Sequence, residues 1–186
     1  MVIRVDAGVA RCELFSFKEG LLSRLAHDLH LEVGRFTLEI ADDQRSLSAS
    51  FEPASIRVIA AVVGGHDDHA VLSAGDREKI RGNLLDDVLD AKRFPEIRFR
   101  STRIEAAPSG LRIEGDLSLH GVTRRIEAVA VESPGSGPST RRWACELSLH
   151  QPDFGIKPYS AALGALRVQA GVKVRVSTEL TVHNLE

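Results

Sequence analysis

The chain has 186 residues, of which 43 % are hydrophobic and 27 % are charged, and its formal net charge is −2. This length suits one domain with a sizeable core and leaves little room for two. The net charge argues against nucleic acid as the main partner, because binding to phosphates needs clustered lysine and arginine side chains.

The first twenty residues contain no uninterrupted apolar stretch, since charged side chains recur throughout them: Arg4, Asp6, Arg11, Glu13, Lys18 and Glu19. A secretory signal needs such a stretch, so we expect a cytoplasmic protein, with the periplasm as the alternative. The longest apolar run, from Val58 to Val63, is far shorter than the ~20 residues of a membrane helix. We therefore expect no integral membrane segment.

Alternation of apolar and polar residues dominates the N-terminal half, as is typical of strands that bury one face. Leu29, Leu31 and Val33 alternate with polar neighbours. The pattern continues through 36–40 and, after a turn-like stretch at 42–46, through 56–60. These segments predict consecutive antiparallel strands.

One segment has helical periodicity instead. Between Asp76 and Lys92 the apolar positions fall on one face of a helix and the opposite face is polar; they are Ile80, Leu84, Leu85, Val88 and Leu89. Phe94-Pro95 follows, and the residue before a proline is biased away from the α conformation. We predict one amphipathic helix over about 76–92.

The C-terminal half returns to alternation. Ile97–Glu105 and Leu111–Leu119 are joined by Ala107-Pro108-Ser109-Gly110, a combination typical of a hairpin turn. The longest strand is expected from Val168 to Val182, where an apolar row faces a row rich in charged side chains.

Roughly eight strands with short connections indicate a meander or up-and-down barrel, because closing the sheet removes exposed edges. Aromatic residues make up only 5 % of the chain, and the apolar rows are mostly valine, leucine, isoleucine and alanine. Such walls leave room for a hydrocarbon chain, as in lipocalin-type barrels. A core filled by side chains is the alternative, and the periodicity alone does not separate the two.

Several segments together resemble a known family. They are Phe15-Ser16-Phe17, Val33-Gly34-Arg35-Phe36, the stretch FPEIRFRS at 94–101, the stretch GDLSLHGVTR at 115–124, and Asp153-Phe154-Gly155-Ile156. In this order and spacing the chain resembles the YceI-like, polyisoprenoid-binding family, from about Val5 to Val182. The resemblance implies an all-β fold over a single domain, 1–186. That fold is an extended lipocalin-like eight-stranded antiparallel barrel with a helix beside it, holding an isoprenoid or similar lipid.

We therefore expect a carrier or storage protein for a long apolar ligand, such as a polyisoprenoid, an isoprenoid quinone precursor or a fatty acid derivative. No cofactor is expected apart from a bound lipid, and a homodimer is compatible with the sequence. The expected ligand-binding residues combine the apolar rows with polar groups near a barrel mouth: Phe17, His27, Asp28, His30, Leu31, Phe36, Phe99, Leu117, Leu119, Val172 and Val174.

The histidines are the main alternatives to a plain apolar site. His27, Asp28 and His30 could meet a polar head group, or they could be satisfied by neighbouring backbone. His66 and His69 flank two aspartates in an expected loop and are weak candidates for a divalent metal and a metal-dependent enzyme. Alternatively, the two aspartates simply solvate the loop. A ligand-free barrel that acts as an interaction module is a further alternative for the whole protein.

Catalytic motifs are missing from the sequence, including Gly-x-Ser-x-Gly, the Walker loop and His-Glu-x-x-His. We therefore predict no catalytic residues and no enzyme activity. The two cysteines, Cys12 and Cys145, both lie in strand-like patterns. We expect reduced, half-buried thiols rather than a disulfide.

Overall fold

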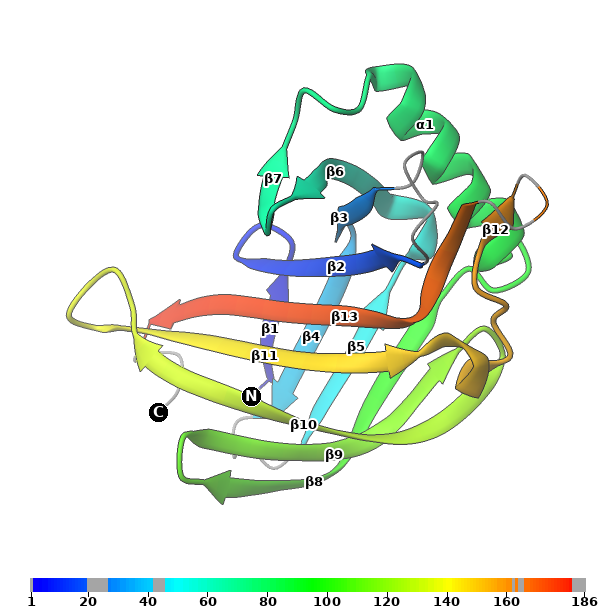
Figure 1. Ribbon diagram of the computed structural model, residues 1–186. Coiled ribbons are helices and arrows are strands. Elements are labelled where there is room, and N and C mark those ends of the chain that lie inside the picture. The colour runs from blue at the N-terminus through cyan, green and yellow to red at the C-terminus, as the bar shows by residue number, and fades with distance from the viewer. Residues whose placement is uncertain (1, 20–26, 42–45, 162, 164–165, 182–186) are drawn as a thin grey trace.

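A computed structural model of the chain describes residues 2–19, 27–41, 46–161, 163 and 166–181. Antiparallel strands make up most of it (Figure 1). The strands are β1 (Val2–Asp6), β2 (Ala10–Lys18), β3 (Asp28–Val33), β4 (Phe36–Ala41), β5 (Leu47–Phe51), β6 (Ile56–Val63), β7 (His66–Asp68), β8 (Ile97–Ala107), β9 (Gly110–Leu119), β10 (Val122–Pro134), β11 (Thr140–His150), β12 (Ser160–Ala161) and β13 (Leu166–Thr181). The helical elements are η1 (Pro53–Ser55), α1 (Ala74–Asn83), η2 (Leu84–Val88) and η3 (Gln151–Phe154).

The sheet closes on itself because three long chain segments are each bent into two strands. In hydrogen-bonded order the strands run β1-β4-β5-β8-β9-β10-β11-β13-β2-β3-β6-β7. However, β1 continues along the chain into β2, β4 follows directly on β3, and β5 leads through η1 into β6. The same three segments therefore supply both ends of the order. Counted as segments, the ring has eight members: β1–β2, β3–β4, β5–β6, β8, β9, β10, β11 and β13.

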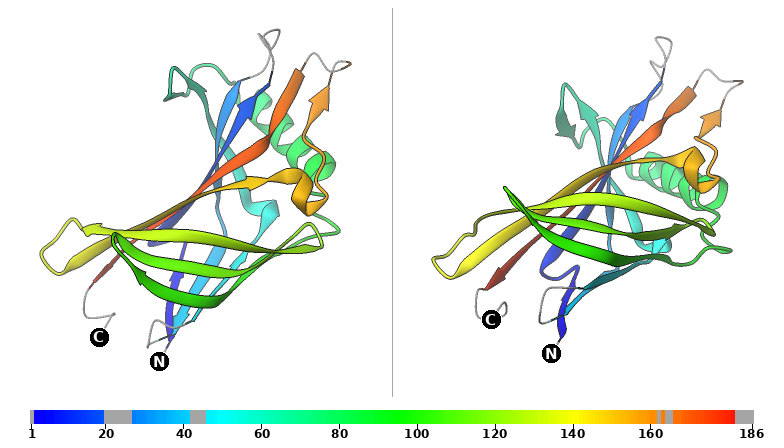
Figure 2. Two further views of the ribbon diagram at one scale, coloured as in Figure 1. Left: turned by 60° about the horizontal axis from the view of Figure 1, so that its bottom comes forward. Right: turned by 90° about the horizontal axis from the view of Figure 1, so that it is seen from below.

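The prediction of an all-β, eight-stranded antiparallel barrel with one helix is thus confirmed, although the bends divide its strands into more elements. Figure 2 shows β8, β9 and β10 crossing over β1, β4 and β5 at a steep angle, with α1 alongside. The short strands β7 and β12 are additions to the ring, and they pair with β6 and β13 respectively.

Specific local contacts hold the bends in place. At Gly34 the chain turns from β3 into β4, and its amide donates to the carbonyl oxygen of Ser55 at 3.2 Å. A side chain at Gly34 would crowd that oxygen, since a Cβ atom would lie only 3.1 Å from it. The Ser55 hydroxyl in turn accepts a hydrogen bond from the Arg35 amide at 2.8 Å and donates to the carbonyl of Glu52 at 2.7 Å. Two bent segments are therefore locked together at one point.

The helix begins slightly earlier than its apolar pattern suggests and changes character before its end. Ser73 caps the N-terminus, because its hydroxyl accepts from the Asp76 amide while the Asp76 carboxylate accepts from the Ser73 amide, a capping box. The regular α-helix ends at Asn83, and η2 continues it as a π-helical turn. Arg81 fixes α1 to the barrel through hydrogen bonds to the carbonyl oxygens of Ile56 (2.9 Å) and Ala54 (2.8 Å).

In the described part of the chain, none of the helices has the length and apolar character required to cross a membrane.

The turns that the structure describes follow the sequence closely, with one correction, whereas positions 42–45 of the predicted turn lie outside the described residues. The predicted β8–β9 hairpin is confirmed, and its Gly110 has a φ of 149°. The stretch expected as a loop around His66 is instead β7, which pairs with β6. Gly64 and Gly65 make the intervening turn with φ values of 59° and 85°. This is the left-handed pair that two-residue hairpins require.

Candidate functional site: the barrel cavity

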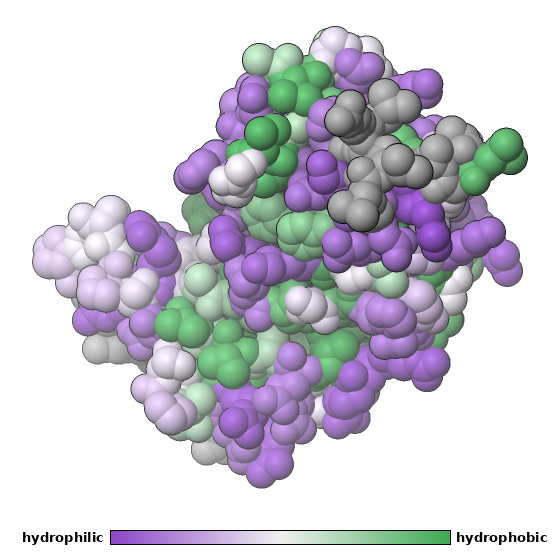
Figure 3. Space-filling model, in the orientation of Figure 1, coloured by the Kyte–Doolittle hydropathy of each residue, from purple (hydrophilic) through white to green (hydrophobic). Residues whose placement is uncertain are grey.

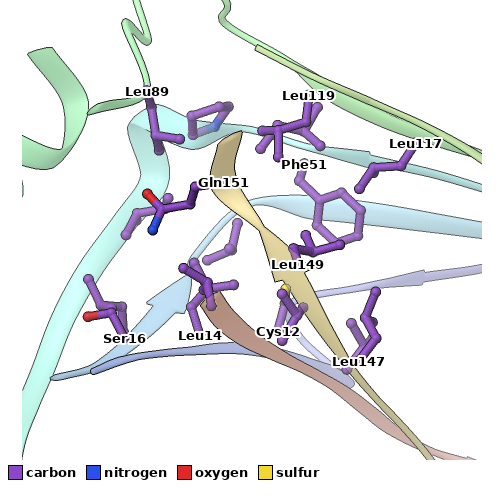
Figure 4. A pocket seen from close by; sticks show the side chains of 18 of the residues that line it. Cys12, Leu14, Ser16, Phe51, Leu89, Leu117, Leu119, Leu147, Leu149 and Gln151 are labelled. Carbon is purple, nitrogen blue, oxygen red and sulfur yellow. The ribbon is translucent and has the colours of Figure 1, made fainter. Parts of the chain in front are cut away.

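A cavity of about 780 Å³ occupies the interior of the barrel. Its wall is mostly aliphatic and comes from strands on every side of the ring. Figure 4 shows Cys12 and Leu14 from β2, Phe51 from β5, Leu117 and Leu119 from β9, and Leu147 and Leu149 from β11 lining the same space. Leu84, Val88 and Leu89 add apolar side chains from η2 and the residue that follows it. The wall is therefore predominantly apolar.

The cavity is hollow rather than filled by side chains. Residues that point inward along the long strands are only partly buried, including Leu111, Ile113, Leu147, Val172 and Val174. Inward side chains of a filled core would be almost fully buried, as Ile56 (2 % exposed) is at the bend of β5–β6. A barrel wall that remains accessible from inside can receive a ligand.

Two packed clusters support the wall. One joins β1 and β4 to β3 and β6 through buried residues such as Val5, Leu38 and Ile56. The other lies where η2 meets β9 and η3, and contains Val88, Leu117 and Phe154 with Ile156. The family-like segment 153–156 therefore has a packing role, since Phe154 and Ile156 are 2 % and 3 % exposed.

A glycine shapes the wall where β8 meets β9. Gly115 occupies an inward position of β9, between Ile113 and Leu117. A Cβ atom there would lie 2.4 Å from Cζ of Phe99 and 2.5 Å from the carbonyl oxygen of Arg100. The Phe99 ring covers the glycine and forms part of the cavity wall.

Polar side chains are few in the wall: Ser16, His27, Asp76, Lys79, Asn83, Gln151, Tyr159 and Thr178. Most belong to α1 or to the strand ends and loop nearest to it. Asn83 Nδ2 donates to the Tyr159 hydroxyl at 2.8 Å. Gln151 Nε2 donates to the carbonyl oxygens of Gln169 (3.0 Å) and Ala170 (3.4 Å). The polar groups thus gather toward one end of an apolar lumen.

The structure brings seven of the sequence-predicted residues into the cavity wall: His27, Leu31, Phe99, Leu117, Leu119, Val172 and Val174. Phe17, Asp28, His30 and Phe36 lie elsewhere. Phe36 is 6 % exposed and stacks on Phe51 with ring centroids 5.7 Å apart. Asp28 accepts a hydrogen bond from the Lys18 amide at 2.8 Å. Contact of the seven with a ligand stays a prediction.

His30 faces away from the cavity, into a polar cluster on the outer surface. Its Nδ1 lies 2.8 Å from Oδ2 of Asp67 on β7, and its Nε2 lies 3.2 Å from Oε1 of Glu13. Its ring stacks on Phe15 at 4.7 Å. The predicted grouping of His27, Asp28 and His30 is therefore split by the strand, with only His27 directed inward.

The candidate metal ligands His66 and His69 are both exposed. Asp67 between them turns to His30 instead. Within the residues that the structure describes, no group of three or more histidine, cysteine, aspartate or glutamate side chains is arranged to hold a metal ion.

Cys12 and Cys145 both contribute to the cavity wall. Burial raises the pKa of the Cys12 thiol to about 12, with a smaller contribution from the carboxylates of Glu13 and Glu32, and raises that of Cys145 to about 11. Both cysteines pair with Val176, from opposite sides of β13. Two strand spacings put their backbones roughly 10 Å apart, beyond the ~7 Å limit for a disulfide.

Ser16, Gln151 and Tyr159 are polar wall residues that the sequence analysis did not identify. Ser16 could have been found, because it continues the inward row of Cys12 and Leu14. Gln151 also continues an inward row, that of Leu147 and Leu149, although it lies beyond the end of β11 in η3. Tyr159 follows no periodic segment, and its position depends on long-range contacts.

Comparison with known proteins relates both the sequence and the fold to one group. Residues 15–182 match the YceI-like domain. A UPF0312 protein of Vibrio cholerae is 29 % identical over 118 residues, covering 61 % of this chain and 61 % of the relative. A UPF0312 protein of Pseudomonas putida is 32 % identical over 95 residues, covering 47 % and 48 %. The matches thus span less than two thirds of these curated relatives.

Solved structures share the fold at low sequence identity. Burkholderia cenocepacia BcnA superposes with a TM-score of 0.66 at 15 % identity, over 95 % of this chain and 99 % of BcnA. A polyisoprenoid binding domain from Saccharophagus degradans gives 0.61 at 10 % identity, over 97 % of both chains. The Campylobacter jejuni YceI protein gives 0.59 at 14 % identity, over 89 % of both.

Proposed function

Because the chain belongs to the YceI-like domain family and its barrel encloses an apolar cavity, we propose that it binds a long apolar ligand inside the barrel. The observation that carries this proposal is the hollow lumen of about 780 Å³ with aliphatic walls. That volume lies within the ~300–1,000 Å³ typical of small-molecule sites.

The composition of the wall supports hydrocarbon as the main recognised feature. Each CH₂ group transferred from water to such a wall contributes about 0.8 kcal/mol. A long chain therefore binds well with few polar contacts, and the affinity rises with its length. The same transfer free energy favours a ligand that fills the lumen over one that leaves part of it empty.

The ligand classes that fit are a polyisoprenoid, an isoprenoid quinone precursor or a fatty acid derivative, held by a carrier or storage protein rather than converted by an enzyme. The Saccharophagus degradans protein of the same fold is described as polyisoprenoid binding. This supports an isoprenoid as the first candidate. The wall of this chain adds the shape and the apolar surface that such a ligand requires.

Native mass spectrometry of the purified protein, followed by organic extraction, tests the proposal. We expect a bound species with the mass of a long-chain lipid, released by the extraction. Protein that carries no adduct and takes up none of a polyprenol, a fatty alcohol or a fatty acid would contradict the proposal.

A blocking substitution gives an independent test. Val174 points into the lumen and is only partly buried, so Val174→Trp should obstruct the cavity and weaken uptake of a fluorescent polyene lipid by roughly tenfold or more. Leu117→Trp should have the same effect from β9. Ser148→Trp on the exposed face of β11 is the matched control, and its uptake should equal that of the parent. Equal uptake by all three variants would exclude the lumen as the binding site.

A further inference from the structure

Gln151 is a buried polar side chain in an otherwise apolar wall. It is 8 % exposed and stands among the leucine side chains of the cavity in Figure 4. Its amide nitrogen is occupied by the carbonyl oxygens of Gln169 and Ala170. In the described residues its amide oxygen receives no hydrogen bond. Gln151 lines the cavity, and its amide oxygen is not one of the buried polar atoms that lack a partner, so a donor on a bound molecule would meet an accessible acceptor.

The local backbone fixes which way this amide points. The pairing of β13 with β2 shifts its register between Val168 and Val172, and such a bulge leaves backbone groups out of the ladder. The side-chain nitrogen of Gln151 donates hydrogen bonds to two carbonyl oxygens of this stretch, those of Gln169 and Ala170. The reversed amide would set its own carbonyl oxygen against both of them, which is repulsive. The oxygen is therefore left for the cavity.

Two hydroxyl-bearing residues of the wall, Tyr159 and Ser16, pair through their backbones with the two ends of this stretch of β13. The carbonyl oxygen of Tyr159 accepts a hydrogen bond from the Val168 amide at 3.1 Å. The phenol oxygen of Tyr159 accepts from Asn83, so its own proton remains available to donate. Ser16 pairs with Val172 at the other end of the bulge, and its hydroxyl has no hydrogen-bond partner in the described residues. We call Ser16, Gln151 and Tyr159 the bulge subsite.

We propose that the bulge subsite binds the polar end of the ligand, and that this end is an uncharged group which both donates and accepts hydrogen bonds, such as an alcohol hydroxyl. This inference rests on the proposed function, because it concerns the head group of the same apolar ligand. A hydroxyl donates to the Gln151 oxygen and accepts from Tyr159 or Ser16. A carboxylate meets the Gln151 oxygen with repulsion, and none of the three subsite side chains carries a positive charge to offset it. An ether or ester accepts but cannot donate.

Competition binding to the full chain tests the head group without any substitution. The probe is a fluorescent polyene lipid, and the competitors share one chain length: a primary alcohol, its methyl ether and the corresponding fatty acid in its ionised form. We expect the alcohol to bind roughly three- to tenfold more tightly than the ether, as one hydrogen bond contributes. The ionised acid should also bind more weakly than the alcohol.

Variants then assign the preference to the subsite. Gln151→Leu should bring the affinity for the alcohol down to that for the ether while the ether is unaffected. Because Gln151→Leu also removes the bonds to the bulge, Tyr159→Phe and Ser16→Ala provide a second measurement that leaves Gln151 in place. At least one of these two variants should reduce the ratio of the affinity for the alcohol to the affinity for the ether. Ser148→Trp on the outer face should leave this ratio unchanged.

The outcomes separate the two proposals. Equal affinity of alcohol and ether in the parent chain overturns the bulge subsite, while displacement of the probe by both upholds apolar binding. An alcohol preference that survives Gln151→Leu, Tyr159→Phe and Ser16→Ala alike also overturns the subsite. Failure of every competitor to displace the probe, with no uptake of the probe itself, contradicts the proposed function instead.

Discussion

The two cysteines in the wall show that the lumen is an apolar environment. Cys12 is 2 % exposed and Cys145 is partly buried, and burial raises both pKa values well above the ordinary thiol value of 9.0. The thiolate, not the thiol, is the nucleophile. The raised values therefore mean that both groups remain neutral, and fit the apolar wall, throughout the physiological pH range.

This leads to a prediction for thiol labelling. Cys145, with a pKa of about 11, should react with an apolar thiol reagent only slowly at pH 7–8, and its rate should rise steeply as the pH approaches 11. Because Cys145 lines the cavity, a bound long-chain lipid should slow the reaction further. Labelling of Cys12→Ala over a pH series, with and without lipid, measures both effects. A rate that levels off below pH 9, or one that lipid leaves unchanged, would contradict this placement.

Individual residues also show which side-chain directions can be predicted from the sequence. Period-2 alternation is sufficient to place Leu31, Leu117 and Val174 inward, because side chains of a strand must alternate. The same alternation sets His30 opposite Leu29 and Leu31, so its outward position could have been predicted once those leucines were assigned to the core. Its partner Asp67 is 37 residues away, and no local pattern indicates that pairing.

Among the elements, the bends within strands were the least predictable. These bends depend on contacts between distant segments, such as Gly34 against Ser55, which local periodicity does not encode. The helix boundary, by contrast, carries a local signal, because Ser73 and Asp76 have the spacing of a capping box. Long regular strands such as β9 and β13 were predicted well, since alternation over ten or more residues leaves little ambiguity.

The close approach of β8 to β9 gives a prediction at this scale. Gly115→Ala should lower the free energy of unfolding by about 1–3 kcal/mol, typical of an overpacked core, because the new methyl group meets Phe99 and the Arg100 carbonyl oxygen. Gly171→Ala on β13 is the matched control, as a Cβ there has no neighbour within 4 Å. Chemical denaturation of both variants measures the difference. Equal stabilities of the two would contradict the packing of Phe99 over Gly115.

At the scale of the whole molecule, the outer surface and the lumen have different compositions. Figure 3 shows mostly polar side chains on the face that carries β10, β11 and β13, with an apolar area near its centre. Ion pairs connect neighbouring strands across the outside, as where Glu146 of β11 meets both Lys173 (3.0 Å) and Arg175 (2.9 Å) of β13. Exposed pairs of this kind contribute little to stability. The stability of the barrel therefore comes mainly from its two packed clusters.

A hollow barrel should accordingly be stabilised by its ligand. A molecule that binds only the folded state adds about 2.7 kcal/mol when its free concentration is one hundred times its Kd, which for a chain of this size corresponds to a rise in Tm of roughly 5–10 °C. We expect extracted protein to melt at a lower temperature than protein as purified. Addition of a long-chain alcohol should restore the higher Tm. The alcohol should raise the Tm of Val174→Trp by less than that of the parent, because the tryptophan side chain obstructs the lumen and weakens binding. Ser148→Trp should respond like the parent. If the alcohol raises the Tm of Val174→Trp as much as that of the parent, the stabilising site lies outside the lumen, and if it raises neither, the lumen does not hold this ligand.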